Sequence, residues 1–162
     1  MKNTHLITYT VIYALLIGLL ITSCSSDDDA SPNDNSQQIA LIETTAVSGS
    51  WRITNLNDSG QDETSDFAGY EFTFNSDGSL VAINGTITMT GTWSITDDTN
   101  SDDDSSNDDG IEFNIFFPVP DTNDFEDLND DWDILSTSST KIELIDISGG
   151  NGGTDLLTFE KN

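Results

Sequence analysis

The chain has 162 residues, of which 30 are Asp or Glu and only four are Lys or Arg, so its net charge is −26 at pH 7. A surface this acidic repels nucleic acid, whose binding depends on Lys and Arg that neutralise phosphates, and we expect no nucleic-acid partner. About 125 residues remain after the N-terminal segments described next, which is enough for one domain with one core.

The N-terminal segment has the composition of a secretory signal. Lys2 precedes an apolar run over residues 6–21. The run is too short to span a membrane comfortably, and a short basic start, an apolar middle and small residues at the end are typical of a signal peptide. The segment "ITSC" that follows resembles a bacterial lipobox, in which the cysteine is acylated and becomes the new N-terminus. The resemblance implies a signal peptide over residues 1–23 and lipid attachment, including palmitate, at Cys24.

Cys24 is the only cysteine and has no partner for a disulfide. The alternative is an ordinary signal peptide with a chance cysteine, but an exposed free thiol is a liability in an oxidising compartment. Several acyl chains hold a protein firmly to a membrane, whereas one chain alone is marginal. Residues 25–29, "SSDDD", resemble the acidic tag of surface lipoproteins of Bacteroidota-type bacteria, although they also suit a solvated spacer. We expect outer-membrane attachment, exposure at the cell surface, and a disordered acidic tether over residues 24–37.

The composition also argues against catalysis. Removal of residues 1–23 would take away the only histidine, His5. The remaining chain would have no Ser-His-Asp triad and no histidine-based zinc site, and an acylated Cys24 would leave no thiol nucleophile. Paired carboxylates can cleave glycosides, but among 30 acidic residues some pairs arise by chance. We therefore expect a protein that is not an enzyme and has no catalytic residue and no cofactor.

The first element expected after the tether is a short helix, in which Ile39, Ile42 and Ala46 recur at helical spacing until Gly49 ends it. After residue 50, apolar residues alternate with a period of two, which is typical of strands with one buried face. This alternation predicts eight strands, over residues 50–57, 69–75, 79–83, 86–96, 111–117, 131–137, 140–147 and 155–161.

Two turn signals set the pairing of three neighbouring strands. "NSDG" at residues 75–78 suits a three-residue hairpin that places Phe74 opposite Leu80. "NG" at residues 84–85 is a strong signal for a type I′ turn, which places Leu80 opposite Met89. Both registers put the same apolar set on one face: Phe72, Phe74, Leu80, Ala82, Ile87, Met89, Trp93 and Ile95.

The remaining strands continue the alternation. Their expected inward residues are Trp51, Ile53, Ile111, Phe113, Ile115, Trp132, Ile134, Ile142, Leu144, Leu157 and Phe159. An eight-stranded sheet with one apolar face hides that face by closing into an up-and-down barrel or by splitting into a sandwich. Sequential hairpins without a long crossover favour the barrel, and we expect an all-β, monomeric protein.

Several motifs suggest a family. A short helix is followed by Gly49-x-Trp51, Asp62-x-Thr64, Tyr70-x-Phe72-x-Phe74 and Gly91-Thr92-Trp93. Residues 38–162 thereby resemble the lipocalin-like domains of bacterial surface lipoproteins. The resemblance implies an eight-stranded barrel, usually without enzymatic activity. It also implies that Trp51 closes the base of the barrel and that Lys161, from the last strand, lies over it in a cation–π contact.

Alternate loops of an up-and-down barrel share an end, and here the loops over residues 58–68, 84–85, 118–130 and 148–154 do so. Three of these four are long, and long loops often carry function. The tether leaves from the opposite end, so we expect this end to face away from the membrane. A small apolar ligand in the barrel would contact Tyr70, Phe117, Phe125 and Leu128 there. The last two could lie on one helical turn that forms a lid, and local packing against the rim is the alternative.

Two loops invite comparison with calcium sites. The loop over residues 97–110 holds seven Asp in fourteen residues, and Ca²⁺ prefers carboxylate oxygens. It lacks the spacing of an EF-hand, however, and a solvated, disordered insertion explains it better. Residues 149–155, "GGNGGTD", contain one imperfect copy of a calcium-binding repeat, and a Gly-rich hairpin loop is the better explanation. We therefore predict no metal site.

Two functions stay open. The chain could be a binding module that holds a small apolar ligand or a partner. It could also be a solid barrel with a structural or adhesion role at the cell surface, with calcium as a potential associate. The interior volume distinguishes them, because eight strands enclose space for side chains alone or for one small ligand.

Overall fold

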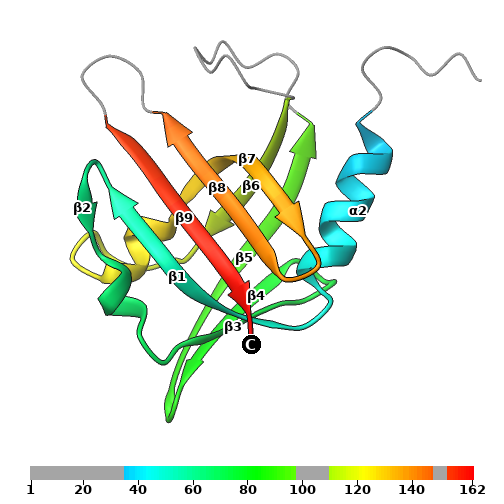
Figure 1. Ribbon diagram of the computed structural model, residues 1–162. Coiled ribbons are helices and arrows are strands. Elements are labelled where there is room, and N and C mark those ends of the chain that lie inside the picture. Colours follow the sequence, from blue (N-terminus) through cyan, green and yellow to red (C-terminus); the bar gives the residue numbers. More distant parts are fainter. Residues whose placement is uncertain (1–34, 98–109, 148–152) are drawn as a thin grey trace, which may run out of the picture. The chain divides into compact units, whose positions relative to one another are not determined.

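The computed structural model describes residues 35–97, 110–147 and 153–162 (Figure 1). These residues form one α-helix, α2 (Ser36–Ala46), and two 3-10 helices, η1 (Thr64–Phe67) and η2 (Asp124–Leu128). The strands are β1 (Ser50–Asp58), β2 (Gln61–Asp62), β3 (Glu71–Phe74), β4 (Ser79–Asn84), β5 (Ile87–Asp97), β6 (Ile111–Phe116), β7 (Asp130–Ser138), β8 (Lys141–Ile147) and β9 (Thr154–Lys161). No helix in the described ranges is long and apolar enough to cross a membrane.

Eight of the strands close into an antiparallel up-and-down barrel, which confirms the predicted fold. Each strand from β3 to β8 pairs with the next one along the chain, and β1 closes the circle by pairing with both β3 and β9. The β1–β9 ladder is long, with Trp51 opposite Lys161 and Leu56 opposite Leu157. β1 and β3 pair only through Ser50 and Trp51. The short strand β2 extends the sheet beside the end of β1.

The turn between β3 and β4 has the predicted conformation. Gly78 has a φ of 83°, a left-handed value that favours glycine, and its N–H donates to the carbonyl of Asn75. Phe74 lies opposite Leu80, as the turn signal predicted.

The predicted register of the next hairpin is wrong by two residues. Met89 lies opposite Ala82 rather than Leu80, and Leu80 lies opposite Gly91. A shift of two residues preserves the alternation, so each side chain keeps its predicted face. Ile87 lies on the inward side, as predicted, but it is beyond the end of the core and is 53% exposed.

The turn itself explains this shift. Asn84 pairs with Ile87 inside the ladder, so the two turn residues are Gly85 and Thr86. Of these two, only Gly85 has a positive φ, 59°, which fits a type II′ turn instead of the predicted type I′ turn. Asn84 stays in the strand, where its side-chain amide donates to the carbonyl of Ala68 at 3.1 Å.

α2 begins at Ser36, within the segment predicted as tether, and residues 1–34 lie outside the described ranges. Ile42 and Ala46 are buried and Ile39 packs against the core, as the helical spacing predicted. The helix lies at the opposite end of the barrel from η1 and η2 (Figure 1).

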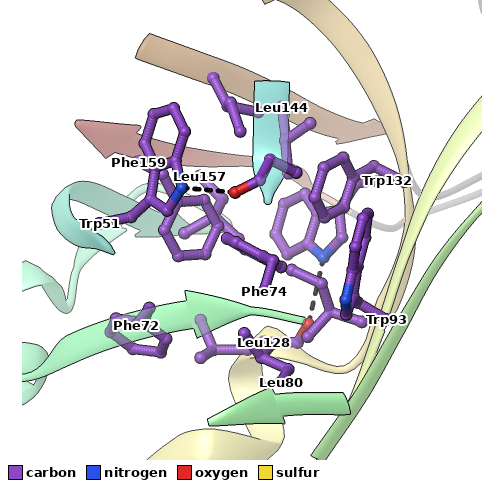
Figure 2. Close-up of a cluster of buried hydrophobic side chains, with 14 of the residues drawn as sticks. Trp51, Phe72, Phe74, Leu80, Trp93, Leu128, Trp132, Leu144, Leu157 and Phe159 are labelled. Atoms are coloured by element: carbon purple, nitrogen blue, oxygen red, sulfur yellow. Dashed lines mark hydrogen bonds between the residues drawn. The ribbon is translucent and has the colours of Figure 1, made fainter. Parts of the chain in front are cut away.

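The barrel interior is filled by large, mostly aromatic side chains (Figure 2). Nearly all the residues predicted to point inward are buried, and six aromatic ones among them are fully buried: Trp51, Phe72, Phe74, Phe113, Trp132 and Phe159. Ile134 is only partly buried, because the β7–β8 ladder shifts register next to it. The core therefore follows the predicted alternation except at this bulge and at the tip of the β4–β5 hairpin.

Candidate functional site

The loops that follow β1, β4, β6 and β8 lie at one end of the barrel, called here the long-loop end. β2 and η1 belong to the first of these loops and η2 to the third, and Figure 1 shows them away from α2. Residues 148–152 of the last loop lie outside the described ranges. The opposite end is called here the helix end.

The residues predicted as ligand contacts come together at the long-loop end. The ring of Phe125 lies at their centre, 5.0 Å from that of Tyr70 and 4.8 Å from that of Phe117. The ring of Phe67 lies 5.3 Å from it. Phe125 is 4% exposed and Leu128 is fully buried. These five residues form an aromatic plug that fills the predicted mouth. Whether they touch a ligand stays a prediction.

η2 forms the predicted helical turn, and hydrogen bonds fix it. The side-chain oxygen of Asn123 accepts from the N–H of Phe125 at 3.0 Å. Trp132 Nε1 donates to the carbonyl of Leu128 at 3.1 Å. Just after the turn, the amide of Asn129 bonds both backbone groups of Phe117. The plug is thus tied to the barrel through polar contacts as well as through ring packing.

Phe67 is not among the predicted site residues. The Asp62-x-Thr64 motif places it, because Asp62 accepts from the N–H of Thr64 at 3.0 Å and the Thr64 hydroxyl accepts from the N–H of Leu56 at 2.9 Å. Hydrogen bonds from the hydroxyl and N–H of Thr64 lower the pKa of Asp62. A single aromatic residue in a polar loop, shortly after an Asp-x-Thr motif, is the signal that could have identified Phe67.

Aromatic contacts continue from the plug into the interior. The ring of Phe72 lies 5.5 Å from that of Phe159, which lies 5.3 Å from that of Phe74. Phe74 then contacts Trp93 and Phe113 at 5.3 and 5.4 Å. All four of these contacts are edge-to-face, an arrangement that aromatic pairs prefer. The rings thus form a continuous column through the barrel.

Surface hollows occur on the outside of the barrel. One of about 600 Å³ lies over β5, β6 and β7. Another of about 420 Å³ lies between α2 and the β3–β4 turn. A third, of about 450 Å³, lies over β1, β7, β8 and β9.

Carboxylates line one side of the long-loop end. Asp58, Asp130, Asp146 and Asp155 lie on the neighbouring strands β1, β7, β8 and β9. Each is half-buried and lies two residues from a buried apolar residue, so alternation directs all four toward the inner side of the barrel. Asp146 lies opposite Asp155, which accepts from the N–H of Ser59 at 2.6 Å. The apolar core therefore ends in a layer of carboxylates.

Three carboxylates at this end lie close enough to hold a metal ion. The ligand oxygens of Asp58, Glu63 and Asp127 are within 4.8 Å of one another. Hard cations such as Ca²⁺ prefer oxygen ligands of this kind. Surface acids often lie this close without a cation, so the grouping alone does not identify a metal site.

Burial, together with neighbouring acidic groups, raises the pKa of two carboxyls at this end. Burial, followed by the charge of Glu63, raises the pKa of Asp127 to about 6. Burial, followed by a hydrogen bond with Asp131 and the charge of Asp146, raises the pKa of Asp130 to about 7. Negative charge therefore accumulates around the plug as the pH approaches neutrality.

The helix end is closed by Trp51. Its side chain is fully buried, and Nε1 donates to the carbonyl of Ala46 at the end of α2 at 2.8 Å. Lys161 Nζ lies 5.3 Å from the centre of the Trp51 ring and donates to Ser48 and to the carbonyl of Ser139. The pair implied by the family resemblance is thus in contact, and its surroundings suit a structural role.

The other sequence-based sites fall outside the described ranges. They are Cys24 and the central part of the acidic loop, residues 98–109.

Comparisons with known proteins give little further information. A scan against protein-family models found no match, and neither did a search of curated proteins. A search of solved structures found a DUF4847 family protein from Bacteroides vulgatus ATCC 8482. It is 18% identical to this chain with a TM-score of 0.47, and the match covers 75% of this chain and 97% of that one. Similarity at this level supports no conclusion about function.

Proposed function

We propose that this protein is a non-enzymatic binding module of the bacterial cell envelope, anchored through Cys24, whose solid barrel presents its outer surface to a partner. The observation that carries the proposal is the filled interior. Aromatic rings run from the plug to Trp93 and Phe113. An interior ligand would have to displace some of them.

The free-energy cost of displacing these rings favours binding at the outer surface of the barrel over binding in its interior. Truncation of a buried Phe costs about 3–5 kcal/mol, and expulsion of Phe125 from its ring contacts would cost a similar amount. That amount lowers the affinity of an interior ligand by about two to four orders of magnitude, because only a small fraction of molecules would be open. A rigid scaffold that binds through its surface carries no such penalty.

The anchor and the absence of catalysis rest on the sequence. The lipobox-like segment before Cys24 and the acidic residues after it support a lipid anchor at the outer membrane. Without its signal peptide the chain would have no histidine, and acylation of Cys24 would leave no free thiol.

Metabolic labelling with a clickable fatty acid tests the anchor. We expect label on the wild-type protein and none on Cys24→Ala, which should also remain uncleaved and leave the membrane fraction more easily. Equal labelling of the two proteins would contradict the anchor.

Mass spectrometry of native protein extracted in detergent tests the solid barrel. We expect no apolar small molecule to co-purify at a stoichiometric level. A stoichiometric lipid that is lost in Phe125→Ser would instead establish an interior ligand site.

A further inference from the structure

One wall of the barrel differs in charge from the other strands that the structure describes. No charged residue occurs over residues 79–96, although 21% of all residues are charged. This segment comprises β4 and nearly all of β5. In a protein with a net charge of −26, it provides an uncharged stretch of surface beside the hollow over β5, β6 and β7.

The outer face of β5 is a row of hydroxyl groups. Its exposed, outward residues are Thr88, Thr90, Thr92, Ser94 and Thr96. Neighbouring members are about 7 Å apart, because residues on one face of a strand are two residues apart. The Thr96 hydroxyl is bonded to Glu112 and Asn114, whereas the hydroxyls of Thr92 and Ser94 have no protein partner within the described ranges.

This row borders the hollow of about 600 Å³ over β5, β6 and β7. Phe116 lies opposite Thr92 and is 56% exposed. Ser94 lies opposite Asn114, which in turn lies opposite Asp131. An exposed ring therefore lies beside hydroxyl, amide and carboxylate groups on one open surface.

We propose that this groove, called here the Phe116 groove, binds a neutral oligosaccharide. The ring of Phe116 offers an apolar surface to the C–H face of a sugar, while Thr92, Ser94, Asn114 and Asp131 offer donors and acceptors to its hydroxyls. The carboxylates at the edge of the groove disfavour anionic sugars and nucleic acid. The hydroxyl, amide and carboxylate groups beside the ring disfavour a purely apolar ligand such as a lipid chain.

The other hollows fit such a ligand less well. The one over β1, β7, β8 and β9 contains Lys141 and Glu143, which already form an ion pair, together with Glu160, which is paired with Arg52. The one beside α2 is lined mostly by apolar atoms and lacks an amide side chain. Of these three hollows, the Phe116 groove alone combines an exposed aromatic side chain with amide and hydroxyl groups.

This inference rests on the proposed function, since it names the partner of the outer surface. Native affinity electrophoresis of the full chain in neutral detergent tests it. The gels contain xylan, β-glucan, mannan or starch as neutral probes and polygalacturonate or heparin as anionic probes. We expect at least one neutral polysaccharide to retard the wild-type protein, in low and in high salt, and the anionic ones to have no effect.

Two variants locate the site. Phe116→Ala should weaken retardation at least tenfold. Leu135→Ala, which removes a similarly exposed apolar side chain (49%) from a part of β7 that does not line the groove, should leave it unchanged. Thermal melts of both variants report on folding.

Absence of retardation by every neutral polysaccharide, retardation by anionic ones alone, or equal retardation of Phe116→Ala would overturn the inference. None of these results affects the labelling and co-purification experiments, which test the proposed function separately.

Discussion

At the helix end, Trp51 is fully buried under α2, bonded to the carbonyl of Ala46 and covered by Lys161. At the long-loop end, Phe125 is held in a plug whose surroundings include several half-buried carboxylates. Both ends are closed by an aromatic residue at the barrel axis. They differ in what lies next to it: a hydrogen-bonded helix end and a cation in one case, and mutually repelling acids in the other.

This difference indicates which end is the weaker. Contacts at the helix end do not depend on the protonation of a carboxyl. At the long-loop end, neutral pH places like charges close together in a partly desolvated environment, which destabilises the folded form. If one end of the barrel opens, we expect it to be the long-loop end. This end should open more readily at pH 8 than at pH 5.

The largest effect should follow loss of the helix-end closure. Trp51→Ala should lower the free energy of unfolding by about 4–5 kcal/mol, because it leaves a cavity and an unpaired carbonyl at Ala46. Urea denaturation followed by circular dichroism measures this. Trp51→Phe, which retains a ring but not the hydrogen bond, should cost less than half as much. Equal losses in the two variants would show that the hydrogen bond, and not the ring volume, dominates.

Truncation of the plug should cost somewhat less. Phe125→Ala should lower the free energy of unfolding by about 3–4 kcal/mol, because the η2 loop can partly collapse into the space. The matched control is Phe116→Ala, which removes an exposed ring and should change stability by less than about 0.5 kcal/mol. A cost for Phe125→Ala as small as that of the control would mean that the plug is not part of the folded core.

The pH dependence should follow Asp127 and Asp130. An Asp in an unfolded chain has a pKa near 3.9, whereas these two have raised values of about 6 and about 7. Between about pH 4 and about pH 7 the folded state binds more protons than the unfolded state, so the free energy of unfolding falls as the pH rises. Melting temperatures should therefore fall from pH 5 to pH 8.

A double variant isolates this effect from the general charge of the protein. Asp127→Asn combined with Asp130→Asn should flatten the pH dependence and raise the melting temperature at pH 8. The control removes the same two charges from exposed positions at the same end, with Asp66→Asn and Asp121→Asn. If the control flattens the profile as much, overall repulsion explains the effect and the two raised pKa values do not.

The smallest effect concerns the cation at the helix end. Lys161→Met keeps most of the apolar side chain but removes the charge over Trp51. A cation–π contact at a partly exposed site contributes about 0.5–1 kcal/mol, and we expect a loss of this size in urea denaturation. A larger loss would indicate that the hydrogen bonds of Lys161 to Ser48 and Ser139 matter more than the ring contact.

The barrel could be predicted because the sequence features that specify it are local. Alternation assigns each residue to a face, and "NSDG" sets the β3–β4 register through one glycine with a positive φ. The β4–β5 register could not be predicted from "NG" alone. In the structure the turn lies at Gly85 and Thr86, and Asn84 stays in the strand with its side chain bonded to Ala68, a contact that no local pattern indicates.

The candidate sites depend still more on long-range contacts. Phe125 and Leu128 could be assigned to one helical turn from their spacing, but Phe67 and Phe117 come from distant loops. The layer of Asp58, Asp130, Asp146 and Asp155 arises from four strands, and among 30 acids no local pattern marks it. The neutral wall over residues 79–96 was visible in the sequence, but its neighbour Phe116 was predicted only as part of a strand.

A titration with Nile red tests the solid barrel most directly, because this neutral apolar dye brightens in apolar pockets and is not repelled by the acidic surface. If the barrel is solid, the fluorescence of Nile red should show no saturable increase with wild-type protein at pH 5 or at pH 8. Stoichiometric binding of the dye to wild-type protein that weakens in Phe125→Ser and is unchanged in Trp51→Phe would contradict a solid barrel. That result would place an apolar ligand behind the plug.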